Sequence, residues 1–291
     1  MHKRVLYASD PRWASMAERL DVLMAGGDFR VLKDEARTRA GLIKTPEGGW
    51  VFVKRVRTGS WTKGLLVSAR GSRVRRWLDG AAMLSRAGFH RPSPLAALEI
   101  LNAGSVTECY LVCEALEGAS VLSAAVLGGG KVPFLARRAL LSAVISEVRR
   151  LHDAGLYTHD LQETNLMVQA QPGKAPRISF VDLEDFRSLR TVSWRRRLLN
   201  LVHLDRSIGR FLNRPARLRC LYEYLDTGKM AHNERRDMVR QVWELREDLE
   251  TRRRMRAVAK SERQAVEAPA EKLASVAPAA PDGFLPPPPA R

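Results

Sequence analysis

The sequence predicts an α+β protein with two lobes, and three observations lead to this fold class. Short β-leaning runs separated by turn residues dominate the chain up to about residue 115, and a single amphipathic helix interrupts them. Apolar residues then recur at helical spacing over most of the chain to about residue 256. A short strand pair lies inside this helical part. We therefore expect a small β-rich N-lobe followed by a larger helical C-lobe.

The N-lobe begins with three short strands, which the sequence predicts at residues 29–33, 39–43 and 49–57. Residues 45–49 have the composition of a hairpin turn between the second and third strands. We expect a helix over 72–88, because apolar residues recur every three or four positions after a candidate N-cap at Ser72. A strand, a turn and a strand then follow in residues 94–104 and 108–116.

The C-lobe begins with a long helix over residues 134–155, which has apolar side chains at helical spacing and a Gly at its end. Two short strands come next, at residues 165–170 and 177–182, and the turn between them contains Pro and Gly. Amphipathic helices follow from residue 193 to about residue 256.

The end of the chain differs from the rest. From residue 257 it is rich in Ala, Pro and Glu and lacks apolar periodicity, so it buries too little apolar surface to offset the entropy lost on ordering. We therefore expect a disordered tail. The predicted organisation is an N-terminal extension, an N-lobe, a C-lobe and this tail, with the boundaries 1–26, 27–115, 116–256 and 257–291.

The composition limits the partners and the compartment. The 49 Lys and Arg against 32 Asp and Glu give a formal net charge of +17, which favours an anionic partner such as nucleic acid, a membrane surface or a phosphorylated substrate. Three scattered cysteines predict reduced thiols. The N-terminus lacks the apolar region of a signal peptide, and no segment is apolar over the length of a membrane span. We therefore expect a cytoplasmic protein whose membrane contact is peripheral.

Three polar residues of the C-lobe stand at positions that suit phosphoryl transfer. Asp160 and Asn165 lie five positions apart in the loop after the long helix, and Asp182 closes the second short strand. Phosphoryl transfer needs a carboxylate that orients the attacking hydroxyl and accepts its proton, and oxygen ligands for the metal on the nucleotide phosphates. Asp160 fits the first role, and Asn165 and Asp182 fit the second, since Mg²⁺ prefers oxygen ligands.

A lysine on an N-lobe strand completes the pattern. The two-residue period of a strand puts Lys54 on the same face as Phe52, where its ammonium group can face a cleft and contact nucleotide phosphates. Each signal is common by itself: the Asp160 loop could be a solvated turn, Lys54 a surface residue and Asp182 a strand end. The order of all of them along the chain is what predicts a phosphotransferase.

Several segments with these motifs are similar to one bacterial family. They include VFVKRVR (51–57), YLVCEALEGA (110–119), LHDAGLYTHDLQETNLMV (151–168), FVDLEDFR (180–187) and RRRLLNLVHL (195–204). Over roughly residues 30–250 the chain resembles the lipopolysaccharide kinase family, whose members phosphorylate Kdo or heptose of the inner core. That family belongs to the wider protein-kinase-like superfamily.

The resemblance implies a two-lobed protein-kinase-like fold that uses ATP and Mg²⁺. It implies Lys54 on the phosphates, Asp160 as the catalytic base, and Asn165 and Asp182 as metal ligands. Glu114 would fall at the hinge between the lobes, where the backbone, more than the side chain, would hold the adenine.

The catalytic loop departs from the pattern of protein kinases. Thr158 stands two positions before Asp160, where protein kinases have His, and His159 directly precedes the Asp. Gln162 replaces the basic residue often found two positions after the Asp. No Gly follows Asp182, so a switch of the Asp-Phe-Gly type is absent.

The N-lobe departs as well. It has no Gly-rich phosphate loop, and we expect the turn in KDEARTRAG to cover the phosphates with Arg37 and Arg39. The helix that should provide a glutamate for Lys54 has none; Asp79 is the nearest carboxylate, and we interpret it as a solvated helix charge. These differences leave a pseudokinase as an alternative.

Basic residues gather in two segments. Residues 48–78 contain eight Lys or Arg and no acid, and residues 187–219 contain ten Arg and one Asp. In the second segment the helical period leaves four of them mainly outside, namely Arg195, Arg196, Arg206 and Arg210. They could be a solvated face, or a docking surface for a lipid A–core acceptor and the anionic inner leaflet. The second interpretation predicts a protein on the inner face of the inner membrane.

Two other functions stay open. The chain could phosphorylate protein Ser/Thr or a small molecule, or it could be a non-catalytic kinase-like scaffold that binds membrane or nucleic acid. We do not expect nucleic acid as a partner, because the sequence has no recognition motif and few aromatic residues lie among the basic ones. The sequence predicts neither the acceptor hydroxyl nor an oligomeric state.

Overall fold

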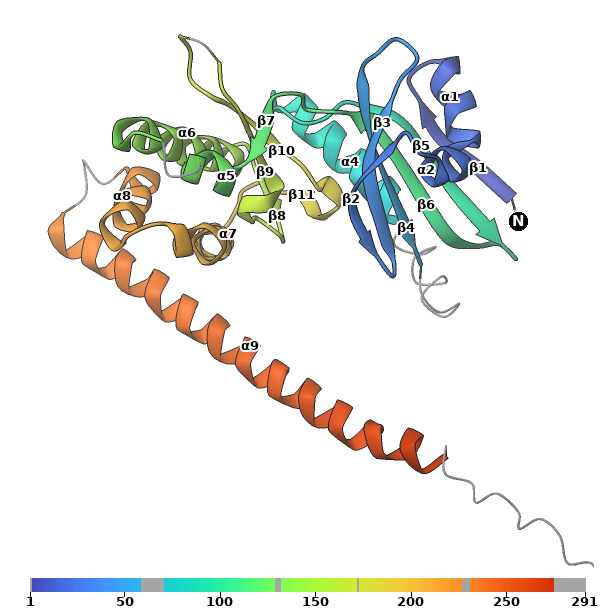
Figure 1. The fold of residues 1–291 in the computed structure, drawn as a ribbon. Helices are drawn as coiled ribbons and strands as arrows, with labels where there is room; N and C mark the ends of the chain where they lie inside the picture. Colours follow the sequence, from blue (N-terminus) through green and yellow to red (C-terminus); the bar gives the residue numbers. More distant parts are fainter. Residues whose placement is uncertain (1, 59–70, 129–131, 172, 227–230, 275–291) are drawn as a thin grey trace, which may run out of the picture. The chain divides into compact units, whose positions relative to one another are not determined.

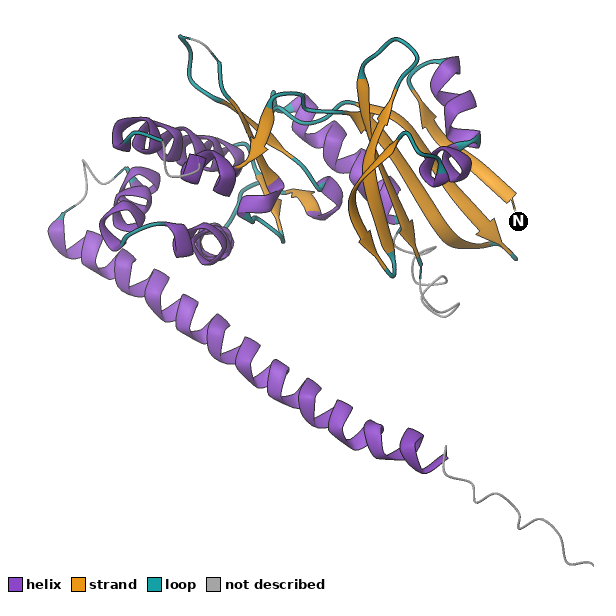
Figure 2. Cartoon of the chain, viewed as in Figure 1, coloured by secondary structure: helices purple, strands orange, loops and turns teal. Residues whose placement is uncertain are grey.

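A computed structural model describes residues 2–58, 71–128, 132–171, 173–226 and 231–274. The chain forms two compact units, residues 1–239 and 240–291, and the first contains the N-lobe and the C-lobe up to residue 239. The predicted α+β architecture is confirmed: strands make up most of the N-lobe, and helices make up most of the C-lobe (Figures 1 and 2). Of the predicted basic segment 48–78, residues 59–70 lie outside the described ranges.

The N-lobe is built on a six-stranded antiparallel sheet in the order β1-β5-β6-β4-β3-β2. Its strands are β1 (His2–Ala8), β2 (Phe29–Glu35), β3 (Thr38–Lys44), β4 (Trp50–Arg57), β5 (Pro94–Asn102) and β6 (Ser105–Glu114). The five predicted strand segments of this lobe correspond to β2 to β6, and the predicted hairpin turn joins β3 to β4. The N-lobe therefore follows the period-two pattern of its sequence closely.

The first 26 residues belong to this sheet, although the sequence predicted a separate extension. Strand β1 pairs with β5, and helices α1 (Pro11–Glu18) and α2 (Leu20–Ala25) follow it. Trp13, Leu20 and Met24 lie in one hydrophobic core with strand residues of the sheet. Ala17 lies in the same core, so apolar residues recur every three or four positions and give the two helices one apolar face, which covers the sheet on the side away from the C-lobe.

Helix α4 (Arg73–Arg86) packs on the opposite face of the sheet. The side chain of Ser72 accepts a hydrogen bond from the Arg75 N–H, so the predicted N-cap is confirmed. Trp77 and Leu84 are buried on the inner side of the helix, and Gly80 lies between them. This helix touches both the sheet and the C-lobe loop that follows β10, and it therefore joins the two lobes.

The C-lobe combines helices with two small sheets. Its helices are α5 (Leu122–Leu127), α6 (Phe134–Asp153), α7 (Trp194–Ile208) and α8 (Arg214–Leu225), with short 3₁₀ turns η2 (Glu163–Asn165), η3 (Leu183–Asp185) and η4 (Gly209–Phe211). Its strands are β7 (Ala119–Val121), β8 (Leu156–Thr158), β9 (Leu166–Gln169), β10 (Arg177–Phe180) and β11 (Phe186–Ser188). They form the sheets β10-β9-β7 and β11-β8. The predicted long helix and strand pair are α6 and β9–β10.

Helix α9 (His232–Ala274) corrects the prediction of disorder from residue 257, because the helix continues to Ala274. Its sequence is rich in Ala, Glu, Lys and Arg, which favour helix without any burial. Ion pairs one turn apart, such as Arg246 with Glu250 and Arg252 with Asp248, add local support. The rest of the predicted tail, residues 275–291, lies outside the described ranges.

The sequence also led to expectations about membrane spans and about the state of the cysteines. None of the helices among them is long and apolar enough to cross a bilayer. The three cysteines are free thiols: Cys109 and Cys113 are buried, and Cys220 is half-buried. Burial raises the pKa of Cys113 to about 12, so this thiol stays protonated and unreactive at neutral pH.

Candidate active site

A cavity of about 770 Å³ lies where the N-lobe sheet faces the β9–β10 hairpin of the C-lobe. Alternate residues of β3 and β4 line it, and Phe52 and Lys54 are among them. Val51 and Val53, which alternate with them along β4, are buried in the core on the other face of the sheet. The period-two prediction for β4 is therefore confirmed, and Lys54 faces a cavity.

The inner part of the cavity is apolar and adjoins the segment between the lobes. Four apolar side chains line it, namely those of Ala40, Leu42, Leu111 and Met167, and residues 114–119 of the segment between the lobes line it as well. Glu114 ends β6, and its N–H donates to the Ser93 carbonyl at 2.9 Å. The side chain of Glu114 is exposed. The backbone is therefore the part of this residue that can contact a flat heterocycle bound between the apolar walls of the cavity.

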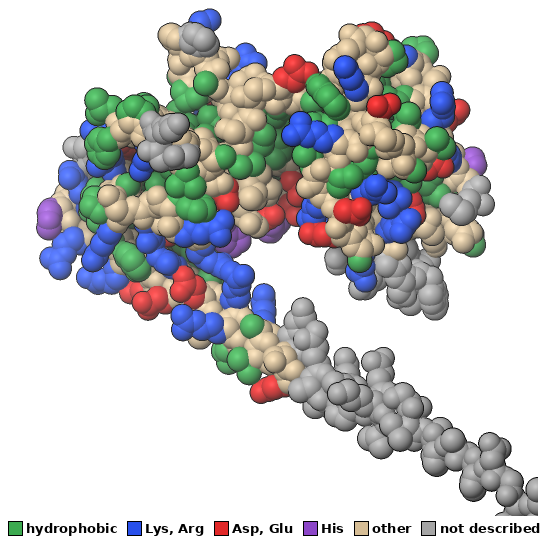
Figure 3. Space-filling model, in the orientation of Figure 1, with side chains coloured by type: hydrophobic (Ala, Val, Ile, Leu, Met, Phe, Trp, Pro, Cys, Tyr) green, Lys and Arg blue, Asp and Glu red, His purple; other side chains and the backbone are tan. Residues whose placement is uncertain are grey.

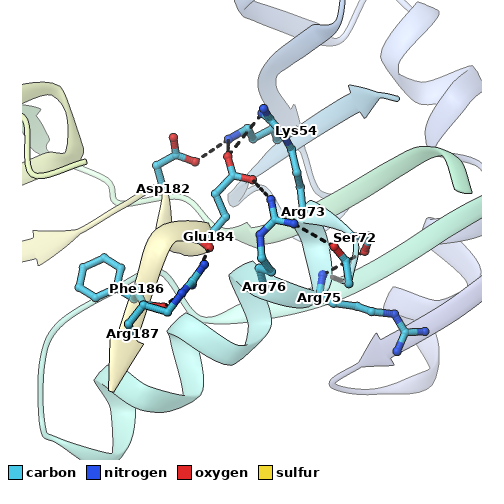
Figure 4. Close-up of polar contacts among 10 residues, drawn as sticks. Lys54, Ser72, Arg73, Arg75, Arg76, Asp182, Glu184, Phe186 and Arg187 are labelled. Carbon is cyan, nitrogen blue, oxygen red and sulfur yellow. Dashed lines mark hydrogen bonds and ion pairs between the residues drawn. The ribbon is translucent and has the colours of Figure 1, made fainter. Parts of the chain in front are cut away.

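Two carboxylates of the C-lobe approach the ammonium group of Lys54 (Figure 4). Its Nζ lies 2.6 Å from Asp182 Oδ1 and 4.0 Å from Glu184 Oε1. Asp182 has a left-handed backbone conformation, with φ 57° and ψ 62°, which turns the chain sharply after β10. Strand β4 of the N-lobe and the turn after β10 of the C-lobe therefore each bring one charged group of an ion pair into the cavity.

Helix α4 contributes two cations to the same cluster. Arg73 Nη1 lies 3.4 Å and Arg76 Nη2 lies 3.8 Å from the carboxylate of Glu184. Glu184 is buried, and burial raises its pKa, while the charges of Lys54 and Arg73 act in the opposite direction. Asp79 is the carboxylate that the sequence offers on this helix as the nearest partner for Lys54. Its side chain is exposed, which agrees with its interpretation as a solvated charge.

The sequence did not indicate that Glu184 lies beside Lys54. It predicted that α4 lacks the glutamate that protein kinases have there, with Asp79 as the nearest carboxylate. The available signal was the pair of arginines, Arg73 and Arg76, on a helix that faces the other lobe, where an acidic side chain can pair with them.

The catalytic loop holds Asp160 beside Asn165. Asn165 Nδ2 donates to the carbonyl of Asp160 at 2.9 Å and to its Oδ2 at 3.2 Å. Gln162 Nε2 donates to Oδ1 of the same carboxylate. Gln162 therefore fills the place of the missing basic residue as a neutral donor, and the carboxylate is held in one orientation.

The β9–β10 hairpin fixes Asn165 next to Asp182. The Val181 N–H donates to the carbonyl of Asn165 at 3.0 Å, one residue before Asp182. Leu166 and Phe180 then pair across the hairpin, so the two predicted metal ligands stand at the same end of it. Both residues line the cavity.

A buried polar chain supports the loop from behind. His152 Nδ1 lies 2.8 Å from the Tyr224 hydroxyl, and its Nε2 lies 3.0 Å from Asn200 Oδ1. Asn200 Nδ2 donates to the carbonyl of Thr158 at 2.7 Å, which leaves Oδ1 as the acceptor and Nε2 of the imidazole as the donor. This chain ties α6, α7 and α8 to β8, two residues before Asp160.

The predicted site residues are thus partly brought together. Lys54, Glu114, Asn165 and Asp182 line one cavity, and Asp160 is hydrogen-bonded to Asn165 without being among the described residues that line it. Asn165 and Asp182 offer oxygen atoms of the kind that suit Mg²⁺. The described residues contain no group of three or more His, Cys, Asp or Glu arranged for a metal, so phosphates and water would have to complete such a site.

Neither of the two arginines predicted to contact the phosphates is among the described residues that line the cavity. Arg37 is exposed at the β2–β3 turn, and Arg39 lies over the ring of Phe29, a core residue on the sheet face away from the cavity. Strand parity is the reason, since Thr38 and Ala40 take the cavity side of β3. Of the basic residues on β2, Arg30 and Lys33 line the cavity.

Comparisons with known proteins identify the family and support the fold. The sequence profile of the lipopolysaccharide kinase (Kdo/WaaP) family matches residues 35–224. A solved structure described as WaaP in complex with acyl carrier protein superposes with a TM-score of 0.57 at 20% identity, covering 84% of this chain and 99% of that chain. No curated protein sequence matches. The similar structure supports the kinase-like fold, and because the family profile spans more than half of the residues, the chain belongs to the lipopolysaccharide kinase (Kdo/WaaP) family.

Proposed function

We propose that the protein transfers the γ-phosphoryl group of ATP to a sugar hydroxyl, on Kdo or heptose, of the lipopolysaccharide inner core. The observation that carries this proposal is the set of Lys54, Asn165 and Asp182 around one cavity, with Asp160 hydrogen-bonded to Asn165. These are the groups that phosphoryl transfer requires, in the order along the chain that a kinase has. The presence of all four groups, Lys54, Asp160, Asn165 and Asp182, also favours an active enzyme over a pseudokinase.

ATP binds in this cavity with its adenine between the apolar walls and against the backbone at residues 114–119. Lys54 then contacts the phosphates, and it exchanges its ion pair with Asp182 for them. Asn165 and Asp182 would hold Mg²⁺, which would neutralise charge on the phosphates.

Asp160 orients the acceptor hydroxyl and takes its proton. Gln162 and Asn165 donate to the two carboxylate oxygens, so the side chain is aimed before the acceptor arrives. A positioned general base contributes about 10²- to 10⁴-fold to the rate.

The acceptor is lipid-linked, and the protein meets it at the cytoplasmic face of the inner membrane. Support comes from basic residues of α7, η4 and α8: Arg195, Arg196, Arg210 and Arg214 are exposed, whereas Arg206, which the sequence placed on the same outer face, is half-buried. Figure 3 shows Lys and Arg side chains gathered on the C-lobe end of the molecule. Each such residue adds about 1 kcal/mol of attraction near an anionic leaflet.

Mass spectrometry of lipid A–core tests this function. A strain that lacks the gene should lose one core phosphate, the wild-type gene should restore it, and the Asp160→Asn variant should not. The purified protein should phosphorylate dephosphorylated core with ATP, and Asp160→Asn should reduce the rate by at least about 10²-fold.

The same experiment separates the two alternatives. Unchanged core phosphate together with ATP-dependent labelling of a protein or small molecule would identify another acceptor. Unchanged core phosphate without ATP binding would identify a non-catalytic scaffold.

A further inference from the structure

Lys54 has two carboxylates beside it, and they differ in what they are free to do. The side chain of Asp182 is 35% exposed and that of Glu184 is 11% exposed. Asp182 is the candidate metal ligand, so it is drawn toward the phosphates when nucleotide binds. Lys54 then keeps one nearby carboxylate, that of Glu184, among the residues that the structure describes.

The charges around Glu184 are the reverse of the usual kinase arrangement. In protein kinases the lysine on the N-lobe strand pairs with a glutamate on the lobe-facing helix. Here that helix, α4, carries Arg73 and Arg76, and the carboxylate comes from the loop after β10 (Figure 4). The carboxylate beside Lys54 therefore comes from the opposite side of the cleft.

We propose that Glu184 is the positioning residue for Lys54, in place of a helix glutamate, and that Arg73 and Arg76 hold it there. This inference rests on the proposed kinase function and adds to it the group that aims the phosphate-binding lysine. Glu184 touches neither acceptor nor reacting atoms, and it acts through Lys54.

The surrounding contacts keep Glu184 fixed enough for this role. Leu183 is fully buried beside it, and the carbonyl of Leu183 fits directly against Gly80 of α4, where a Cβ would lie 2.1 Å from that oxygen. On the other side, Arg187 donates to the carbonyl of Glu184 at 3.4 Å. The loop and the helix therefore form one rigid junction around the Glu184 carboxylate.

A double-mutant cycle between Glu184 and Lys54 tests the proposal. Glu184→Gln keeps the size of the side chain and removes its charge, so the KM for ATP should rise and kcat/KM for ATP should fall by about tenfold or more. In a Lys54→Met background the same change should cost less than about threefold, because the lysine it positions is gone. Where turnover of Lys54→Met is too slow, the ATP Kd from titration calorimetry supplies the same cycle.

Two controls separate positioning from structure. Asp185→Asn removes the neighbouring negative charge of the same loop and should leave kcat/KM within about twofold. Thermal unfolding should show that Glu184→Gln is folded at the assay temperature. Equal losses from Glu184→Gln in both backgrounds, or no loss in the wild type, would overturn the proposal. Failure of the wild-type protein to bind ATP would instead refute the kinase function itself.

Discussion

At the scale of the residue, a few buried polar groups decide how the catalytic loop is held. His152 is 1% exposed, and it links Tyr224 to Asn200, whose amide supports β8 just before Asp160. Burial lowers the pKa of His152 to about 4, although the Asn200 hydrogen bond acts in the opposite direction. The neutral imidazole is therefore part of the folded structure.

This histidine makes the stability of the fold depend on pH. The unfolded chain binds a proton at this residue with a pKa near 6.5, and the folded chain does so only near 4, so acid favours unfolding. Between pH 7 and pH 5 the free energy of unfolding should fall by about 2 kcal/mol through His152. Urea denaturation at both pH values measures this loss, which His152→Gln should not show.

The exposed His90 provides the matched control. His90→Gln removes a histidine that is not buried, so it should keep the wild-type difference between pH 7 and pH 5. An equal pH dependence in the wild-type protein and in His152→Gln would contradict the role given to the buried imidazole.

At the scale of the element, the contact between α4 and η3 is the junction on which the Lys54 cluster depends. Gly80 is required there because a Cβ would meet the Leu183 carbonyl at 2.1 Å, and backbone on both sides leaves little room to move. Gly80→Ala should therefore displace α4 from η3, lower the free energy of unfolding by about 1–3 kcal/mol and weaken ATP binding.

Gly27→Ala is the control for this substitution, because nothing lies within 4 Å of the added methyl group. Thermal unfolding and an ATP titration of both variants give the comparison. A Gly80→Ala variant with wild-type stability and wild-type ATP affinity would show that neither property depends on the close contact between α4 and η3.

Sequence patterns predicted most elements because the signals are local. Alternation in β4, the N-cap before α4 and the glycine after α6 each act within a few residues. The patterns did not show that β1 pairs with β5, since this contact joins residues far apart in the chain. They also missed the end of α9, because a helix without an apolar face was interpreted as disorder.

At the scale of the whole molecule, the excess of positive charge is the property that favours binding to an anionic membrane. Reversing Arg195 and Arg196 to Glu on α7 should weaken binding to vesicles with 30% anionic lipid by about tenfold or more. Added salt should weaken wild-type binding in the same direction. Sedimentation with the vesicles measures both effects.

Arg19→Glu with Lys44→Glu on the N-lobe is the matched control. Both residues are exposed, and the pair changes the net charge by the same amount, so membrane binding should stay close to wild type. Equal weakening by the two pairs would indicate that net charge, and not the α7 face, determines binding.

By itself the sequence determined the fold class, the family and four of the groups around the site: Lys54, Asp160, Asn165 and Asp182. These depend on short motifs whose spacing is fixed by the strand, turn and helix in which they lie. Only the tertiary structure decided which charged side chains meet, because that depends on which face each element presents. It turned Arg39 away from the cavity and brought Glu184 to Lys54 and the α4 arginines, which lie more than a hundred residues away in the chain.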